Sequence, residues 1–346
     1  MSSVRQVAKK AGVSIATVSR VINGADGVAP DMRDRVNDAV AACNYKPAVG
    51  RRTVDLIALL YAGPFTIGSP YDSACLEGIA DRMRQTEYDV ILLDAARDKA
   101  PDESLKQFFV RKGVRGAIIR GTSAERSLVA EWATEGLPLV VLGDHFPCPG
   151  LSFVYADSAA ASRQAVEYLV SIGHKRVAFA ACERDDGDHL DRLSAYQQVL
   201  DSHGLGDERL VCRVPPHRLD GAQLLRQLLG MRDRPTAIYV ADPLVAVGVV
   251  NEAHRLGVKV PEDLSIIGFD DTDMRSGVFP KMSAVCQETT QLGRAAFDGL
   301  LRAIDQPAGV APEVNTFEAW LELNETTCPP PVEAERILPT GARLRD

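Results

Sequence analysis

The sequence lacks the features that mark secreted, membrane-bound and many catalytic proteins. Its longest apolar runs fall far short of the roughly 20 residues of a membrane span, and no signal-peptide core stands near the N-terminus. No Gly-x-Ser-x-Gly, His-Glu-x-x-His or Walker phosphate loop occurs, so the signatures of common hydrolases, zinc proteases and nucleotide hydrolases are missing. Seven cysteines are scattered without any Cys-x-x-Cys pair, at positions 43, 75, 148, 182, 212, 286 and 328. We therefore expect a cytoplasmic protein with reduced thiols, no metal, no cofactor and no membrane association.

Acidic residues are scarce at one end of the chain. Residues 1–53 carry nine Lys and Arg against four Asp and Glu, a net charge of +5, whereas the remaining residues carry 30 against 43, a net charge of −13. A basic segment ahead of an acidic body is typical of a nucleic-acid-binding module joined to a part that does not contact nucleic acid. The 346 residues, 46% of them apolar, are enough for more than one globular domain.

The basic segment contains a pattern of two short helices. Apolar residues at spacings of three and four predict a helix over 4–11, and Ser3 opens a capping-box pattern ahead of it. Gly12 can take the positive φ of a tight corner, and Ser14 is placed to cap a second helix over 15–22. Two helices joined in this way form a helix-turn-helix, whose second helix enters the major groove of DNA. The alternative is an ordinary helical corner without DNA binding.

The second predicted helix carries hydroxyl, amide and guanidinium groups on its polar face. These groups suit phosphates and base edges, and they belong to Ser14, Thr17, Ser19, Arg20 and Asn23. Thr17 and Ser19 could instead be ordinary surface residues. No acidic residue occurs from 1 to 25, which favours the DNA-binding interpretation.

Beyond residue 54 the sequence alternates between apolar strand-like runs and amphipathic helical stretches. Strands are expected at 56–60, 90–93, 116–119, 139–142, 177–181, 237–240 and 265–268. Helices are expected at 73–84, 103–111, 124–135, 159–172, 193–203, 221–229 and 244–256. This alternation predicts parallel sheets covered on both faces, and the number of units favours two sheets in two lobes. Ligands of such folds bind outside the carboxyl ends of strands, so we expect a cleft between the lobes.

The segment VAKKAGVSIATVSRVING, residues 7–24, is similar to the opening of the lactose-repressor (LacI-type) family of bacterial transcription regulators. The similarity covers about residues 3–327 and continues in 172–179, 260–271, 280–285 and 292–296. It implies an all-α helix-turn-helix head followed by an α/β body of two lobes, like a periplasmic binding protein. The implied divisions are the head at 1–47, a hinge at 48–53, the effector-binding and dimerisation body at 54–327 and a tail at 328–346. The lobes would exchange chain near Ala156, Ala284 and Phe317.

The resemblance also implies roles for residues of the head. Ile15, Ala16 and Arg20 align with the positions that read bases, where an arginine can make a bidentate contact to guanine worth about 1–3 kcal/mol of discrimination. Contacts to phosphate would come from Ser3, Ser14, Thr17, Ser19 and Asn23.

The joint after the head departs from the family pattern. The family hinge is longer, becomes a helix on operator DNA and wedges a leucine into the minor groove. Only residues 48–52 separate Pro47 from Thr53 here, and none of them is leucine. We therefore expect Arg51 and Arg52 to contact phosphate or the minor groove through charge.

The residues after 327 also give an expectation about assembly. They hold four prolines and little periodicity, so we expect a disordered or loosely docked tail. The tail lacks the leucine heptads of a tetramerisation bundle, so we expect a homodimer.

Six residues of the body are implied by the resemblance to bind an effector: Tyr71, Ser73, Asp144, Arg192, Asp242 and Asp270. An arginine fork and acceptor carboxylates together suit the hydroxyls of a sugar. Arg192 could instead be a surface residue in an Asp-rich loop, and Asp242 and Asp270 could be helix N-caps.

We therefore expect a homodimeric repressor at the bacterial nucleoid. It would bind pseudo-palindromic double-stranded operator DNA under the control of a small molecule, a sugar or sugar derivative, bound between the lobes. The alternatives are a solute-binding protein without gene regulation, which the basic head opposes, and a sugar-processing enzyme that uses Asp242 and Asp270 as an acid pair.

Overall fold

The structure is a computed structural model that describes residues 3–22, 28–43, 55–183, 186–305 and 311–344. Internal contacts divide the chain into two units, residues 1–55 and 56–346, which we call the head and the body. Among the described residues no helix is long and apolar enough to cross a membrane.

The described part of the head forms three helices, α1 (Val4–Ala11), α2 (Ile15–Ile22) and α3 (Pro30–Ala42). The corner between the first two forms as predicted, because Gly12 has a φ of 64° and the Ser14 hydroxyl accepts a hydrogen bond of 3.0 Å from the Thr17 amide. Arg35 of α3 donates to the last carbonyl of α1, at Ala11, over 2.7 Å. The small core consists of Val7, Ala8, Ala11, Val18, Val21, Val36 and Ala39.

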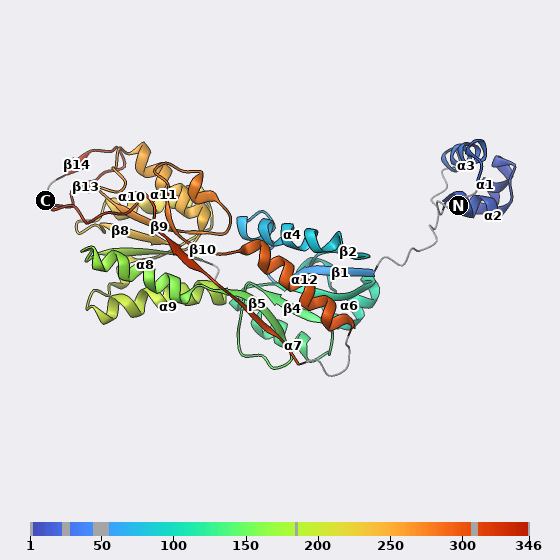
Figure 1. Cartoon of the computed structure of the whole chain (residues 1–346), viewed down its shortest axis with the longest axis horizontal. Helices are drawn as coiled ribbons and strands as arrows, with labels where there is room; N and C mark the ends of the chain where they lie inside the picture. Colours follow the sequence, from blue (N-terminus) through green and yellow to red (C-terminus); the bar gives the residue numbers. More distant parts are fainter. Residues whose placement is uncertain (1–2, 23–27, 44–54, 184–185, 306–310, 345–346) are drawn as a thin grey trace. The chain divides into compact units, whose positions relative to one another are not determined.

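The body has two lobes, each built on one six-stranded sheet (Figure 1). Lobe 1 consists of β1 (Asp55–Tyr61), α4 (Pro70–Met83), β2 (Tyr88–Asp94), α5 (Ala95–Asp98), α6 (Leu105–Lys112), β3 (Val114–Arg120), η1 (Ser123–Glu125), α7 (Arg126–Ala133), β4 (Leu139–Leu142), β5 (Ser152–Asp157), α12 (Thr289–Asp305) and β11 (Val314–Glu318). Its strand order is β11-β5-β4-β3-β1-β2, and the pairs from β11 to β1 run parallel.

Lobe 2 is built in the same way from later parts of the chain. It consists of α8 (Ala159–Ser171), β6 (Val177–Cys182), α9 (Gly187–Ser202), η2 (Glu208–Leu210), β7 (Val211–Val214), α10 (Arg218–Leu229), β8 (Ala237–Val240), α11 (Pro243–Arg255), β9 (Ser265–Asp270), η3 (Met274–Ser276), β10 (Ser283–Cys286), β12 (Trp320–Glu322), β13 (Arg336–Ile337) and β14 (Arg343–Leu344). The sheet order is β12-β10-β9-β8-β6-β7, with β12 antiparallel to β10 and the other pairs parallel.

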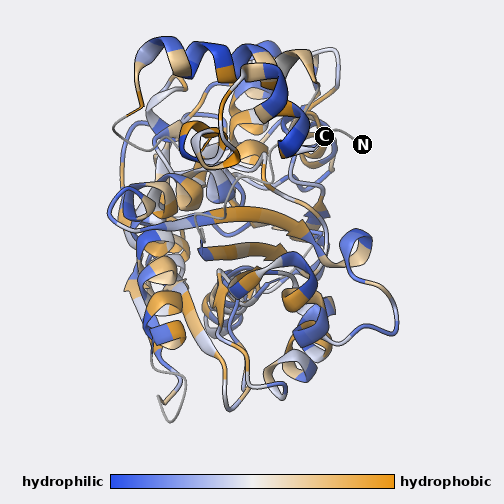
Figure 2. Cartoon of the chain, turned by 90° about the vertical axis from the view of Figure 1, so that its right-hand side faces the viewer, coloured by the Kyte–Doolittle hydropathy of each residue, from blue (hydrophilic) through white to orange (hydrophobic). Residues whose placement is uncertain are grey.

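Helices cover both faces of each sheet, so successive strand residues enter different cores. In β1, Ala58 and Leu60 pack with α6 and α7, whereas Ile57 and Leu59 pack with α4 and α12. In lobe 2, α10 and α11 cover one face and α8 and α9 the other. Figure 2 accordingly shows largely hydrophobic strands, with hydrophilic residues on the helices and loops. The predicted two-sheet α/β architecture is confirmed.

Three crossovers connect the lobes, close to the three positions that the resemblance implied. The chain passes from β5 to α8 after Asp157, from β10 to α12 after Cys286, and from β11 to β12 after Glu318. Lobe 1 therefore receives one of its helices and one of its edge strands from beyond residue 288.

Two helix pairs cross with their backbones in close contact, one pair in each lobe. Between α4 and α12, a Cβ atom at Gly78 would lie 2.0 Å from the Thr290 carbonyl oxygen, and one at Gly293 would lie 2.0 Å from the Cys75 carbonyl oxygen. Gly221 and Gly248 allow the same close backbone contact between α10 and α11. Only glycine permits such an approach.

The expectation of a disordered or loosely docked tail is wrong for residues 328–344. Ile337 is fully buried in the core of lobe 2, and its strand β13 pairs with β14. Arg234 donates to the Glu335 carbonyl over 2.6 Å, and the His174 ring lies 2.9 Å from the Cys328 carbonyl oxygen. One buried apolar side chain and several hydrogen bonds to backbone atoms hold the segment in place. Interactions of this kind leave no periodic pattern of apolar residues in the sequence.

Candidate functional site

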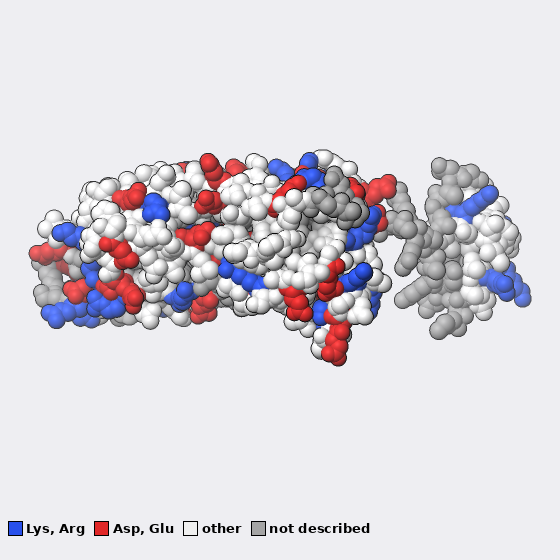
Figure 3. All heavy atoms as spheres, turned by 90° about the horizontal axis from the view of Figure 1, so that it is seen from below, with Lys and Arg blue, Asp and Glu red and all other residues white. Residues whose placement is uncertain are grey.

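The predicted DNA-reading side chains lie on the outer face of α2. Val18 and Val21 turn inward, whereas Ala16, Arg20 and the side chain of Ile15, which is 46% accessible, face solvent. The face of the head visible in Figure 3 shows only Lys and Arg among the charged side chains of its described residues. This arrangement leaves α2 free to enter a DNA groove.

The smaller polar residues of the predicted interface are partly occupied by local hydrogen bonds. The Ser14 hydroxyl lies 2.9 Å from the Thr17 hydroxyl, and the amide of the exposed Ser3 donates to the side chain of Gln6 over 2.9 Å. Ser19 is also exposed. The predicted contacts Asn23, Arg51 and Arg52 lie outside the described residues.

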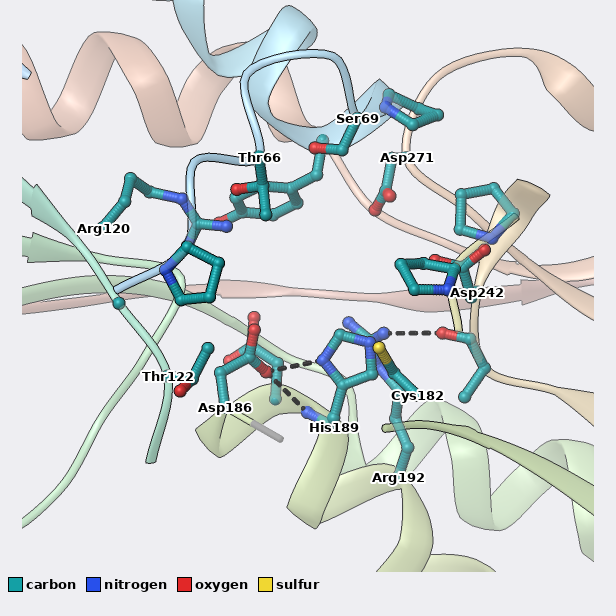
Figure 4. Close-up of a pocket in the computed structure, with 18 residues that line it drawn as sticks. Thr66, Ser69, Arg120, Thr122, Cys182, Asp186, His189, Arg192, Asp242 and Asp271 are labelled. Carbon is teal, nitrogen blue, oxygen red and sulfur yellow. Dashed lines mark hydrogen bonds and ion pairs between the residues drawn. The ribbon is translucent and has the colours of Figure 1, made fainter. Parts of the chain in front are cut away.

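The body contains a cavity of ≈ 100 Å³ between its lobes (Figure 4). A water molecule needs roughly 10–15 Å³ by this measure, so the space suits a small organic molecule. The polar side chains that line it stand at the carboxyl ends of β1, β3, β6, β8 and β9, where the predicted cleft was expected. They are Thr66, Ser69, Tyr71, Arg120, Thr122, Asp186, Asp188, His189, Arg192, Asp242 and Asp271.

Arg120, at the end of β3, supplies the positive charge of lobe 1. Its Nε donates to Asp72 over 2.8 Å and its Nη1 to the Leu142 carbonyl over 2.6 Å. The guanidinium also stacks on Tyr71, 4.6 Å from the ring centre. Because Asp72 also accepts from the hydroxyl of Tyr61 over 3.0 Å, this arginine is held rigidly at the cavity wall.

Arg192, on α9, supplies the positive charge of lobe 2 and is only 3% exposed. Its Nε donates to the Ser158 hydroxyl over 3.2 Å and its Nη1 to the Ala241 carbonyl over 3.0 Å, the second of which is drawn in Figure 4. Its guanidinium carbon lies 3.4 Å from the centre of the Phe269 ring. The structure thus places Arg192 in the cavity wall, as the resemblance implied.

The first turn of α9 places two carboxyls in different electrostatic surroundings. Asp186 caps the helix and contacts the His189 ring at 2.7 Å. Burial alone would raise the pKa of Asp186, but the neighbouring His189 and Arg192 outweigh it and hold that pKa well below its ordinary value. For Asp188, burial and then the charge of Asp186 raise the pKa well above its ordinary value.

Two more carboxyls face the cavity from lobe 2. Asp242 caps α11 by accepting from the Val245 amide over 2.9 Å, and burial raises its pKa. Asp271 follows β9, accepts from the Gln287 side chain over 2.5 Å, and has a pKa that burial raises to about 6. The Asp242 side chain thus both caps a helix and lines the cavity.

The structure brings together three of the six predicted effector residues, Tyr71, Arg192 and Asp242. Ser73 is exposed on α4 and does not line the cavity. Asp270 is buried outside the cavity, where its oxygens accept from the amides of its own loop and from the Arg275 guanidinium over 2.8 Å. Its neighbour Asp271 lines the cavity in its place, because successive residues of an extended chain point in opposite directions.

Asp144, the sixth predicted residue, joins the two lobes outside the cavity lining. It forms an ion pair with Arg126 at 2.5 Å and accepts from the Gly187 amide of lobe 2 over 2.6 Å. The neighbouring His145 makes a second bond between the lobes, from its Nε2 to Asp191 at 2.9 Å. Asp144 and His145 therefore connect the two lobes directly.

Comparison with known proteins decides the family. A model of bacterial regulatory proteins of the lacI family matches residues 3–48, and a model of the periplasmic binding protein-like domain matches residues 166–322. The HTH-type transcriptional repressor CytR of Escherichia coli (strain K12) is 30% identical over 312 residues, which are 89% of this chain and 90% of that repressor. The chain belongs to the LacI family of bacterial regulatory proteins.

Other relatives of this LacI-family chain agree. The ribose operon repressor of Haemophilus influenzae is 26% identical, over 89% of this chain and 93% of that repressor. Among solved structures, the CelR–cellobiose complex has a TM-score of 0.68 at 26% identity and covers 94% of this chain and all of that one. A LacI family regulator of Enterococcus faecium with bound ribose has a TM-score of 0.69 at 25% identity, over 80% of this chain and 99% of that one.

The comparisons confirm the family, the fold class and the expectation of a DNA-binding transcriptional regulator. CytR and the catabolite control protein A of Staphylococcus xylosus, 29% identical over 90% of this chain, are regulators rather than enzymes. This finding opposes the two alternatives, a solute-binding protein and a sugar-processing enzyme.

Several cavity residues of this LacI-family body were missed from the sequence. Arg120 follows a predicted apolar strand directly, so the rule that selected Asp242 would also have selected it. Asp186, Asp188 and His189 lie in the Asp-rich stretch before Arg192. From the sequence, that stretch was interpreted only as a surface loop. Among the described residues no group of three or more His, Cys, Asp or Glu is arranged to hold a metal ion.

Proposed function

We propose that this LacI-family regulator is a homodimeric repressor of the bacterial cytoplasm whose affinity for operator DNA is set by a sugar bound between the lobes. The observation that carries the proposal is the cavity itself. It lies where the strands of both lobes end, and both arginines and four carboxyls line it.

The chemistry of the cavity wall suits hydroxyl groups. Carboxylates such as those of Asp186 and Asp242 accept hydrogen bonds from hydroxyls, and the guanidinium of Arg192 can donate to them. Two similar proteins were solved with cellobiose and with ribose bound. We therefore assign effector binding to Tyr71, Arg120, Arg192, Asp242 and Asp271, with Asp144 and His145 closing the lobes.

On the DNA side, α2 would lie in the major groove of each half-site of a pseudo-palindromic operator. Arg20 would read a guanine, Ile15 and Ala16 would make apolar contacts to bases, and the small polar residues would position the helix on phosphates. The hinge arginines Arg51 and Arg52 would add contacts through charge.

Two large apolar side chains support the proposed dimer. Leu219 is 77% exposed at the start of α10, and Phe279 is 80% exposed before β10. Leu219 is next to Arg218, whose carbonyl group lies against Gly248 of α11. Phe279 lines a groove together with Val250 of α11. Exposed apolar side chains such as these two would be covered by the same surface of a second copy.

The proposed mechanism couples the two sites through lobe closure. A sugar that contacts Arg120 in lobe 1 and Arg192 in lobe 2 binds better to one degree of closure than to another. Closure would change the spacing of the two heads in a dimer, so sugar and operator would alter each other's affinity by the same factor.

A gel shift of the full-length protein on the DNA upstream of its own gene tests the proposal, with and without ribose and cellobiose. We expect a shift at low salt that one of the sugars changes. Arg192→Ala should lower the sensitivity to that sugar at least tenfold and leave the shift without sugar intact, whereas Arg163→Ala, on the surface of α8, should behave like the wild type. Absence of any shift, or an unchanged sugar response in Arg192→Ala, would contradict the proposal.

A further inference from the structure

One carboxyl of the cavity wall has an oxygen without a hydrogen-bond partner among the described residues. Asp188 lies in the first turn of α9, is 2% exposed and lines the cavity. Its Oδ1 is fully buried, and no described residue forms a hydrogen bond with it. Buried polar atoms of native proteins are almost always hydrogen-bonded, so an unpartnered atom in a cavity wall points to a ligand.

The charges around Asp188 favour its protonated form. Asp186 on the same helix and Asp144 of lobe 1 are the nearby acids, and Arg192 and Arg120 are the nearby bases. Burial and the charge of Asp186 outweigh the two arginines and raise the pKa of Asp188 well above its ordinary value. A protonated carboxyl differs from a carboxylate because it can donate an O–H hydrogen bond.

Both arginines of the cavity already interact with carboxyl groups of the protein. Arg120 already faces the carboxylate of Asp72 at 2.8 Å. Among the described residues Arg192 has no hydrogen-bonded carboxylate, but its charge lowers the pKa of Asp186, Asp188, Asp242 and Asp271, and for Asp186 and Asp242 the charge of His189 acts more strongly still. A phosphate or carboxylate on a ligand would therefore meet more negative than positive charge in this wall.

We propose that Asp188 stays protonated in the cavity and donates its O–H to an oxygen of an uncharged, polyhydroxylated effector, so that the site selects free sugars over sugar phosphates and sugar acids. This inference rests on the proposed function, because it concerns the ligand of the same cavity. Asp188 is thus a specificity-determining residue rather than a negative charge of the site.

The test compares two substitutions that remove the same charge. Asp188→Asn keeps a neutral hydrogen-bond donor in the same volume, whereas Asp188→Ala removes the donor. Asp201→Asn, an exposed residue in the last turn of α9, is the matched control. Calorimetric titration of the full-length protein would use ribose, glucose and cellobiose as neutral probes, with ribose 5-phosphate, glucose 6-phosphate and gluconate as anionic ones.

We expect Asp188→Asn to bind the responding neutral sugar within threefold of the wild type at pH 6, and Asp188→Ala to bind it at least tenfold more weakly. Wild-type affinity should fall with rising pH once Asp188 ionises, whereas the affinity of Asp188→Asn should stay flat. The anionic probes should bind at least tenfold more weakly than their neutral parents. Equal losses in Asp188→Asn and Asp188→Ala, or tighter binding of an anionic probe, would overturn the inference.

A measurement without ligand separates this inference from the proposed function. A carboxyl with a raised pKa in the folded state stabilises the protein below its unfolded pKa, about 3.9, and loses that contribution as the pH rises through the folded pKa. The wild type should therefore lose stability relative to Asp188→Asn as the pH rises, and a constant difference would refute a protonated Asp188. If none of the three sugars binds, the proposed function fails for them, and this measurement still decides the state of Asp188.

Discussion

The crossing of α4 and α12 gives a prediction in which one substitution has opposite effects at two positions of one helix. Gly293 faces α4, where a Cβ atom would lie 2.0 Å from the Cys75 carbonyl oxygen. Gly299 lies six residues later on α12, where the nearest neighbours of a Cβ atom are an Arg302 nitrogen at 3.7 Å and a Val140 methyl at 3.8 Å, ordinary contact distances.

The magnitude follows from these distances. Cβ contacts in proteins essentially never fall below 3.0 Å, so Gly293→Ala requires α12 and α4 to separate by about 1 Å. Overpacking of this kind costs about 1–3 kcal/mol, and the higher helix propensity of alanine returns about 1 kcal/mol. The free energy of unfolding should therefore fall by up to about 2 kcal/mol. Gly299→Ala meets no obstacle and should raise it by up to about 1 kcal/mol.

Thermal unfolding of the two variants and the wild type in the same buffer measures the effect. A change of 1 kcal/mol shifts the midpoint by roughly 2–4 °C in a domain of 150–250 residues. Gly293→Ala should melt several degrees below the wild type, and Gly299→Ala at or above it. Equal midpoints for both variants would show that the two helices do not cross with their backbones in contact, and the packing described for lobe 1 would then be wrong.

Two further predictions concern the head and the closure of the lobes. Arg20→Ala should lower the preference for operator over random DNA by about ten- to a hundredfold, from a lost base contact of about 1–3 kcal/mol, while calorimetry shows unchanged effector binding; equal loss of both would contradict the modular assignment. The hydrogen bond to Asp191 raises the pKa of His145. The stabilisation from this bond is therefore complete at pH values below the unfolded histidine pKa of about 6.5, and it is lost as the pH rises through the pKa of the folded state. When unfolding is measured from pH 5 to 9, the wild type should lose its greater stability over His145→Gln above pH 6.5. His254→Gln, at an exposed position, is the control. A stability difference that persists at pH 9 would exclude a charged His145 in this bond.

The sequence predicted the elements that have a strong period. The seven predicted strands correspond to β1, β2, β3, β4, β6, β8 and β9, most of which are apolar on both faces. The other five strands of the two sheets were not predicted, namely β5, β7, β10, β11 and β12. β11 alternates between exposed and half-buried residues, and β12 has only three residues. Such strands are fixed by their neighbours in the sheet, which a one-dimensional pattern does not contain.

The cavity residues show the same difference. Some could be placed from their own segment of sequence, whereas others depend on partners far away along the chain. Arg192 could be placed because residues 192–196 resemble the family's effector-binding arginine followed by a small residue and an aromatic one, and Asp242 because it directly follows a predicted strand. Asp144 could not be distinguished from a ligand contact, because its partner Gly187 lies in the other lobe, 43 residues away. The exchange of Asp270 for Asp271 depends on one step of the chain at the end of β9. It is determined by the hydrogen bonds that Asp270 accepts from the amides of its own loop and from the Arg275 guanidinium.

The three crossovers affect how the protein can fold during synthesis. Residues up to 157 leave the ribosome before the rest of the body and include all of lobe 1 except α12 and β11. Leu292, Phe297 and Leu300 of α12, however, fill the core beneath β1 and β3. A nascent lobe 1 therefore exposes that apolar face until lobe 2 has also been translated up to β10. The head, whose core is complete within 43 residues, has no such delay. We expect the body to depend on chaperones during translation in a way that the DNA-binding head does not.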